Sequence, residues 1–99
     1  MKIEFRIFEE VPIASYEKYT ILLEGEEGRH KKPHVHLKSK GNRLASIAIY
    51  DGEVLAGKLP RDIRTCLLNW VDNNRDALLQ DWKAMQRHEP PREYGFGPC

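Results

Sequence analysis

The spacing of apolar residues changes once along the chain, near Pro60, and this change restricts the folds that it can adopt. Up to Tyr50, apolar and polar residues alternate, which is the period of a β-strand with one buried face. From Pro60 onward, apolar residues recur every three or four positions, as on an amphipathic helix. Strands first and helices last predict an α+β fold, with a small antiparallel sheet of about four strands packed on one or two C-terminal helices.

The same patterns set the expected boundaries. Strands are expected over residues 2–8, 19–23, 34–39 and 43–50, with a loop at 11–14. The first helix is expected to start near Leu59, and a break at residues 73–74 predicts a second helix, with one kinked helix as the alternative. Residues 88–99 follow neither period. We therefore expect a single domain over residues 1–87 and a Pro/Gly-rich tail over 88–99 that either stays unpacked or docks on a partner.

The composition is that of an ordinary globular protein. The chain has 99 residues, 40% of them hydrophobic and 31% charged, which suits one hydrophobic core. No run of about 18 apolar residues occurs and no leader pattern follows Met1, so no membrane contact is expected. Cys66 and Cys99 match neither a metal-type pair nor a disulfide framework. These features predict a cytoplasmic protein.

The net charge of +1 conceals a basic segment. Residues 28–43 contain no acidic residue and carry six bases, namely Arg29, Lys31, Lys32, Lys38, Lys40 and Arg43. Such a cluster attracts phosphate groups, which makes these residues candidates for nucleic-acid or phosphate binding. Equally, lysines commonly protect the edge of a β-sheet and have no ligand. No aromatic residue lies among them, so a surface that stacks single-stranded bases is not expected.

Histidines form the second notable feature of this segment. On a strand, His34 and His36 would lie on one face with Cα atoms about 6.5 Å apart, while His30 lies on the preceding loop. Imidazole nitrogens are good ligands for a divalent metal such as zinc, so His30, His34 and His36 are the candidate metal ligands. Asp51 and Glu53 are alternative third ligands.

The turn between the two strands decides which face carries the histidines. A three-residue turn, 40–42, would pair Leu37 with Ala45 and Val35 with Ile47 and so produce a continuous apolar face. His34 and His36 would then share the opposite face with Ser46 and Ala48, accessible to a ligand. A two-residue turn would exchange the faces.

Three interpretations of the histidines remain open. They can be hydrogen-bonded residues of a polar face with no ligand, a metal site, or a phosphate-binding or acid–base pair, with His34 and His36 as the candidate catalytic residues. The cations nearby would repel a metal ion and attract a phosphate.

Three further features of the sequence are the His-x-x-Pro-His-x-His string that starts at His30, the Gly-Lys-Leu-Pro sequence at residues 57–60, and the tryptophans at positions 70 and 82. Together they resemble the motifs of a bacterial family, the domain of unknown function 4160. The resemblance covers roughly Tyr19 to Met85. It implies a bacterial or phage origin and a gene that often lies beside that of another small protein, as in toxin–antitoxin pairs.

Two functional hypotheses follow. The first is a binding or regulatory component of a two-gene, toxin–antitoxin-like module, which acts through a protein partner encoded nearby or another copy of itself, and through nucleic acid. The second is a metal-dependent or histidine-dependent nuclease or phosphoesterase that uses His30, His34 and His36. No phosphate-binding glycine loop supports the second hypothesis.

Overall fold

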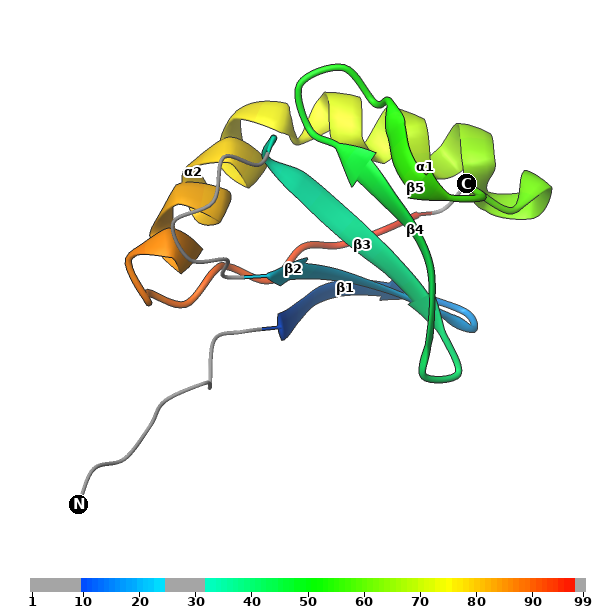
Figure 1. The fold of residues 1–99 in the computed structure, drawn as a ribbon, viewed down its shortest axis with the longest axis horizontal. Helices are drawn as coiled ribbons and strands as arrows, with labels where there is room; N and C mark the ends of the chain where they lie inside the picture. Colours follow the sequence, from blue (N-terminus) through cyan, green and yellow to red (C-terminus); the bar gives the residue numbers. More distant parts are fainter. Residues whose placement is uncertain (1–9, 25–31, 98–99) are drawn as a thin grey trace.

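The structure is a computed structural model that describes residues 10–24 and 32–97. It contains five strands followed by two helices (Figure 1). Their bounds are β1 Glu10–Tyr16, β2 Tyr19–Glu24, β3 His34–Ser39, β4 Asn42–Ala48, β5 Val54–Gly57, α1 Arg61–Asn73 and α2 Arg75–Gln86. The predicted α+β class is confirmed, with one more strand than expected. The strand predicted over residues 2–8 lies outside the described residues.

The strands form one antiparallel sheet in the order β1-β2-β3-β4-β5, so each strand pairs with its neighbours in sequence. Both helices lie against the same face of this sheet (Figure 1). The core lies between them and consists of side chains such as Val35, Leu37, Ile47, Leu67 and Val71. Neither α1 nor α2 covers the other face of the sheet, which is the face of interest for function.

The loop predicted at residues 11–14 is wrong, because this segment belongs to β1. Proline lacks the N–H group that an interior strand needs, which makes Pro12 unfavourable inside a sheet. In the structure β1 is an edge strand, and its register shifts between Pro12 and Ala14. Edges and bulges are the places where a sheet accommodates proline.

The predicted pairing of β3 with β4 is confirmed at its centre. Val35 pairs with Ile47 and Leu37 with Ala45, and all four side chains are buried in the core. The predicted three-residue turn is wrong, since Ser39 pairs with Asn42. Lys40 and Gly41 both have positive φ, as a two-residue hairpin turn requires. A register shift between Leu37 and Lys38 restores the expected faces.

Two separate helices are confirmed, and the alternative of one kinked helix is wrong. Asn74 ends α1 and precedes α2. Arg75 donates a hydrogen bond from Nε to the carbonyl oxygen of Ile49, which ties the start of α2 to the residue just after β4.

No helix in the described ranges is long and apolar enough to cross a membrane. Cys66 of α1 is disulfide-bonded, contrary to the sequence-based expectation.

The C-terminal segment packs on this chain, whereas the sequence predicted a tail that stays unpacked or docks on a partner. It runs from the end of α2 back toward α1 (Figure 1). Arg92 and Tyr94 both hydrogen-bond the buried carboxylate of Asp81 on α2. The Tyr94 N–H donates to the Ile13 carbonyl of β1, and the Trp70 indole donates to the Gly95 carbonyl.

The short strand β5 depends on Gly57, the first residue of the Gly-Lys-Leu-Pro motif. Gly57 has a φ of 74°, and a Cβ added there would overlap the carbonyl group of Leu44. The glycine thus allows β5 to approach the irregular end of β4. Leu59 is then buried in the core and Pro60 precedes α1, so the motif joins the sheet to the helices.

We expect Gly57→Ala to lower the free energy of unfolding by more than about 2 kcal/mol, because the left-handed backbone and the overlap with Leu44 both oppose a side chain. Gly41→Ala is the matched control. Gly41 also has positive φ but no atom near an added Cβ, so a loss of about 1 kcal/mol is expected. Urea denaturation of both variants measures the difference. Equal losses would contradict the role of the Leu44 contact.

Candidate metal centre

His34 and His36 lie side by side on β3, on the face of the sheet that neither α1 nor α2 covers. The alternation of β3 sends Val35 and Leu37 into the core and the imidazoles to the opposite face. The rings meet edge to face with centroids 4.8 Å apart. Only 7% of His34 and 4% of His36 is exposed, so the expectation that both are openly accessible is wrong. The shared face was predicted correctly.

The hydrogen bond of His34 fixes its tautomer. Its Nδ1 lies 2.7 Å from the carbonyl oxygen of Lys32, and a carbonyl only accepts hydrogen bonds. Nδ1 must therefore carry the proton, and in the neutral ring Nε2 keeps its lone pair. Within the described residues, no hydrogen bond of Nε2 is found. This is the arrangement of a metal-binding histidine, whose second nitrogen is usually held by an outer acceptor.

His36 is hydrogen-bonded at both nitrogens. Nε2 lies 2.7 Å from Glu24 Oε1, and Nδ1 lies 3.0 Å from the hydroxyl oxygen of Ser46 on β4. With an ionised Glu24, Nε2–H donates to the carboxylate and Ser46 donates to Nδ1. A hydroxyl can also accept, so Ser46 equally supports the tautomer in which Nε2 is free to bind a metal. Burial is the main cause that lowers the pKa of His36, and the Arg43 charge adds to it.

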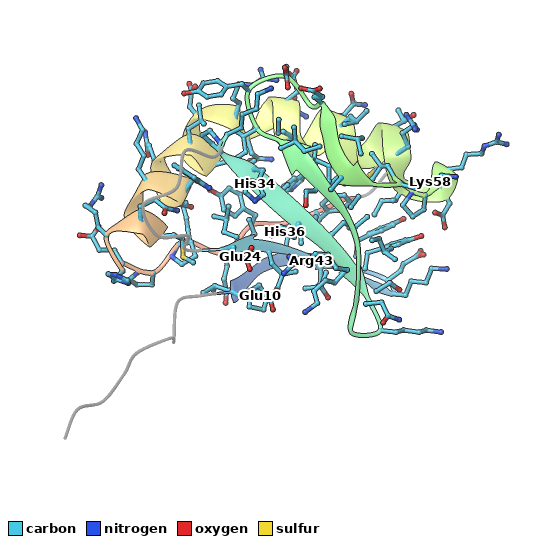
Figure 2. All side chains as sticks on the ribbon, viewed as in Figure 1. Glu10, Glu24, His34, His36, Arg43 and Lys58 are labelled. Carbon is cyan, nitrogen blue, oxygen red and sulfur yellow. The ribbon has the colours of Figure 1, made fainter. Side chains whose placement is uncertain are left out.

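Glu24, His34 and His36 together form a candidate metal site (Figure 2). One ligand atom from each residue can be chosen so that all three lie within 4.8 Å of one another. Ligands of a tetrahedral zinc ion are about 3.4 Å apart, so the three groups would need to close by about 1 Å. Two imidazoles and one carboxylate are an established donor set for zinc and iron, and the residues present fit such an ion.

The carboxylate that lies beside His34 and His36 is not one of those expected from the sequence. His30 lies outside the described residues, so its place in the site stays a prediction. Glu53 pairs with Lys32 at 2.9 Å, and Asp51 accepts a hydrogen bond from the backbone N–H of Glu53. Glu24 of β2 is the carboxylate that lies beside both histidines.

Three of the basic candidates are ion-paired. Lys32 contacts Glu53, Lys38 contacts Glu10, and Arg43 contacts both Glu10 and Glu24. The Lys38 hydrogen bond is the main cause that lowers the pKa of Glu10. Lys40 is exposed in the turn, and Arg29 and Lys31 lie outside the described residues. The repulsion that the sequence predicted between these cations and a metal is therefore largely balanced by carboxylates.

The sequence analysis missed Glu24, Glu10 and Ser46 as members of the site. Ser46 was expected opposite His36, which is confirmed, but its hydrogen bond was not anticipated. Glu24 reaches the histidines because β2 pairs with β3 so that Leu22 lies opposite His36. Residues 25–33 connect these strands, and a connection of this length does not fix a register. The alternation of β2, which places Leu22 and Glu24 on one face, was the only available signal.

A surface cavity of about 380 Å³ lies over the cluster. Glu24, His34 and His36 line it together with Arg43, Lys32 and the β5 residue Leu55. The imidazoles thus line a surface cavity together with Lys32 and Arg43.

The lowered pKa of His36 predicts a pH dependence of stability. Because the unfolded state has the higher pKa, about 6.5, it takes up more protons as the pH falls below this value. The stability contributed by neutral His36 is present above pH about 6.5 and is lost as the pH falls through the pKa of the folded protein. Between pH about 7.5 and 5.5, urea denaturation should show a smaller loss for His36→Gln than for the wild type. His88→Gln, which removes an exposed histidine, should keep the wild-type dependence.

The comparisons with known proteins agree with the motifs. The chain matches the model of a domain of unknown function, DUF4160, over residues 19–83. No curated protein and no solved structure matches it. The matched range contains the Glu24, His34 and His36 cluster, the Gly-Lys-Leu-Pro motif and both helical tryptophans. It spans well over half of the chain, and the protein therefore belongs to the DUF4160 family.

Proposed function

We propose that this protein binds a divalent metal ion of the zinc class through Glu24, His34 and His36 and uses it to hydrolyse a phosphate ester. The observation that carries the proposal is the hydrogen bond from His34 Nδ1 to the Lys32 carbonyl, which leaves Nε2 with a lone pair beside His36 and Glu24. Of the two functional hypotheses from the sequence, this geometry favours the nuclease or phosphoesterase.

The alternative of purely structural histidines accounts for only part of this geometry. His36 is satisfied at both nitrogens, as a structural histidine would be. Within the described residues, His34 is hydrogen-bonded at Nδ1 and not at Nε2. A metal ion could take Nε2. With the tautomer of His36 reversed, each imidazole would donate its Nδ1–H to an oxygen, of Lys32 or of Ser46, and direct Nε2 to a shared ion.

The chemistry requires few other groups. A bound ion would supply a Lewis acid for an ester oxygen and a water molecule that ionises near neutral pH. In hydrolysis, the water oxygen adds to phosphorus, the bond from phosphorus to the ester oxygen breaks, and the leaving alcohol takes the proton. The surface cavity would admit the ester, and the protein side chains would orient it.

We propose separately that the protein has a regulatory role in which it binds a protein partner. The C-terminal segment, one of its supports in the sequence, is packed on this chain. The remaining structural support is β5, the last strand of the sheet, whose Leu55 is 39% exposed. Sheet edges with exposed apolar side chains favour pairing with another chain.

Metal titration of untagged, EDTA-treated protein tests the centre. We expect one Zn²⁺ or Mn²⁺ per chain by isothermal titration calorimetry. His34→Gln and Glu24→Gln should each lower the affinity by more than about 100-fold, because loss of an outer-shell group alone costs about 10- to 100-fold. His88→Gln and Glu89→Gln, which change exposed residues outside the cluster, are the matched controls and should bind as the wild type does. No binding by the wild type would reject the centre.

Hydrolysis is tested on the same proteins. RNA and bis(p-nitrophenyl) phosphate should be cleaved by the metal-loaded wild type, and EDTA should abolish the cleavage. The His34→Gln and Glu24→Gln variants should lose it, whereas the two controls retain it. Equal rates in His34→Gln and the wild type would show that the cleavage does not depend on this cluster.

The partner is tested by co-purification with the product of the neighbouring gene. We expect a complex that Leu55→Lys weakens, because this change places a charge on β5, the strand at which the partner is proposed to bind. Lys58→Ala, a change just beyond the end of β5, is the control. Absence of a complex, together with growth that is indifferent to expression of either gene, would reject the module.

A further inference from the structure

Arg43 contacts Glu24, one of the candidate metal ligands, and bridges it to a second carboxylate. Its Nη2 donates to Glu10 at 2.7 Å and to Glu24 at 3.3 Å. The side chain is 43% exposed and lines the cavity over the histidines. Figure 2 shows Arg43, Glu10, Glu24 and the two histidines on the same side of the sheet. Within the described residues, Arg43 Nε and Nη1 make no hydrogen bond, so the guanidinium has donors to spare.

Glu24 therefore has two competing uses. It accepts hydrogen bonds from His36 and from Arg43, and it is also the carboxylate of the candidate centre. His36 contacts Oε1 of Glu24 and Arg43 contacts Oε2. An ion held by both His36 Nε2 and Glu24 would replace the His36 proton at Oε1, and its positive charge would weaken the longer of the two Arg43 contacts. Glu10, at the shorter distance, would keep Arg43 at the rim of the cavity.

The charges around the cavity favour an anion once a metal is bound. Three cations, Lys32, Lys38 and Arg43, are paired with three carboxylates, Glu10, Glu24 and Glu53. This group is thus balanced without an ion. A divalent ion adds two positive charges that no described side chain of the group compensates, which raises the local attraction for an anion.

We propose that metal binding releases Arg43 from Glu24 and that Arg43 and the ion then hold a phosphoryl group together. This inference rests on the proposed metal centre and adds the substrate class, an anchoring residue and an order, with the metal first and the phosphate second. Arg43 contacts the substrate in this arrangement, and Glu10 is the residue that positions it.

Phosphate suits these donors better than a carboxylate does. The planar guanidinium presents two parallel N–H groups, which take two oxygens, and the ion takes a third. A phosphoryl group supplies three oxygens, whereas a carboxylate has two. The surface cavity of about 380 Å³ also leaves space for a substituent on the phosphate.

Anion titrations of the Co²⁺-loaded protein test the proposal, since the visible spectrum of Co²⁺ reports a new ligand. We expect inorganic phosphate or the dinucleotide UpU to change this spectrum, and the compound that binds identifies a free phosphate or a diester. Arg43→Met should weaken this binding by about 10- to 100-fold, the size expected for a charge-assisted pair of hydrogen bonds. Co²⁺ affinity should not fall, because Glu24 loses a competitor. Lys40→Met, a cation of the same hairpin without these carboxylate contacts, is the matched control and should bind as the wild type does.

The outcomes separate the two proposals. Failure of the wild type to bind Co²⁺, seen before any anion is added, would reject the metal centre and this inference with it. Normal Co²⁺ binding with equal phosphate affinity in Arg43→Met and the wild type would reject this inference alone. Equal phosphate affinity without the metal, or acetate binding as tight as phosphate, would also reject it. Should Arg43→Met fail to fold by circular dichroism, Arg43→Lys decides, with a smaller loss expected because lysine keeps the charge but lacks the paired donors.

Discussion

The register between β3 and β4 is the constraint on which both the core and the candidate site depend. Side chains on a strand alternate, so a shift by one residue would bring His34 and His36 into the core and expose Val35 and Leu37. The core contacts of these apolar side chains stabilise the observed register. A one-residue shift would move Val35 and Leu37 out of the core and break those contacts. Packing on one face of the sheet therefore determines the position of the imidazoles on the other.

This dependence explains why the faces could be predicted although the turn could not. The sequence analysis required an apolar face and inferred a three-residue turn to obtain it. The chain instead uses Lys40 and Gly41 with a register shift beside Leu37, which gives the same faces. The alternation of apolar residues shows which side chains of a strand must be buried. It does not show how many residues the turn contains, because turns of different length can give the same buried face. Gly57, which relieves the close approach to Leu44, reflects the same irregularity at the other edge of β4.

Elements that depend on contacts distant in sequence were not predictable in the same way. Both histidines were identified from their spacing, but Glu24 joins them through the pairing of β2 with β3, across a connection that carries no register information. Proline at position 12 concealed β1, because its compatibility with a strand depends on that strand lying at the edge. The packing of Tyr94 depends on the buried carboxylate of Asp81, and neither residue indicates the other in sequence.

The charges around His34 and His36 affect the binding of both a metal ion and an anion. An unpaired basic hairpin would oppose a divalent ion, and this was the main sequence-based argument against a metal. Three of these cations, Lys32, Lys38 and Arg43, are paired with Glu10, Glu24 and Glu53, which come from three other parts of the chain. In the proposed centre, such a balanced group would take an ion at low electrostatic cost and would then attract an anion. Because Glu24 would serve either the ion or its two hydrogen-bond donors, it would couple metal binding to the release of Arg43.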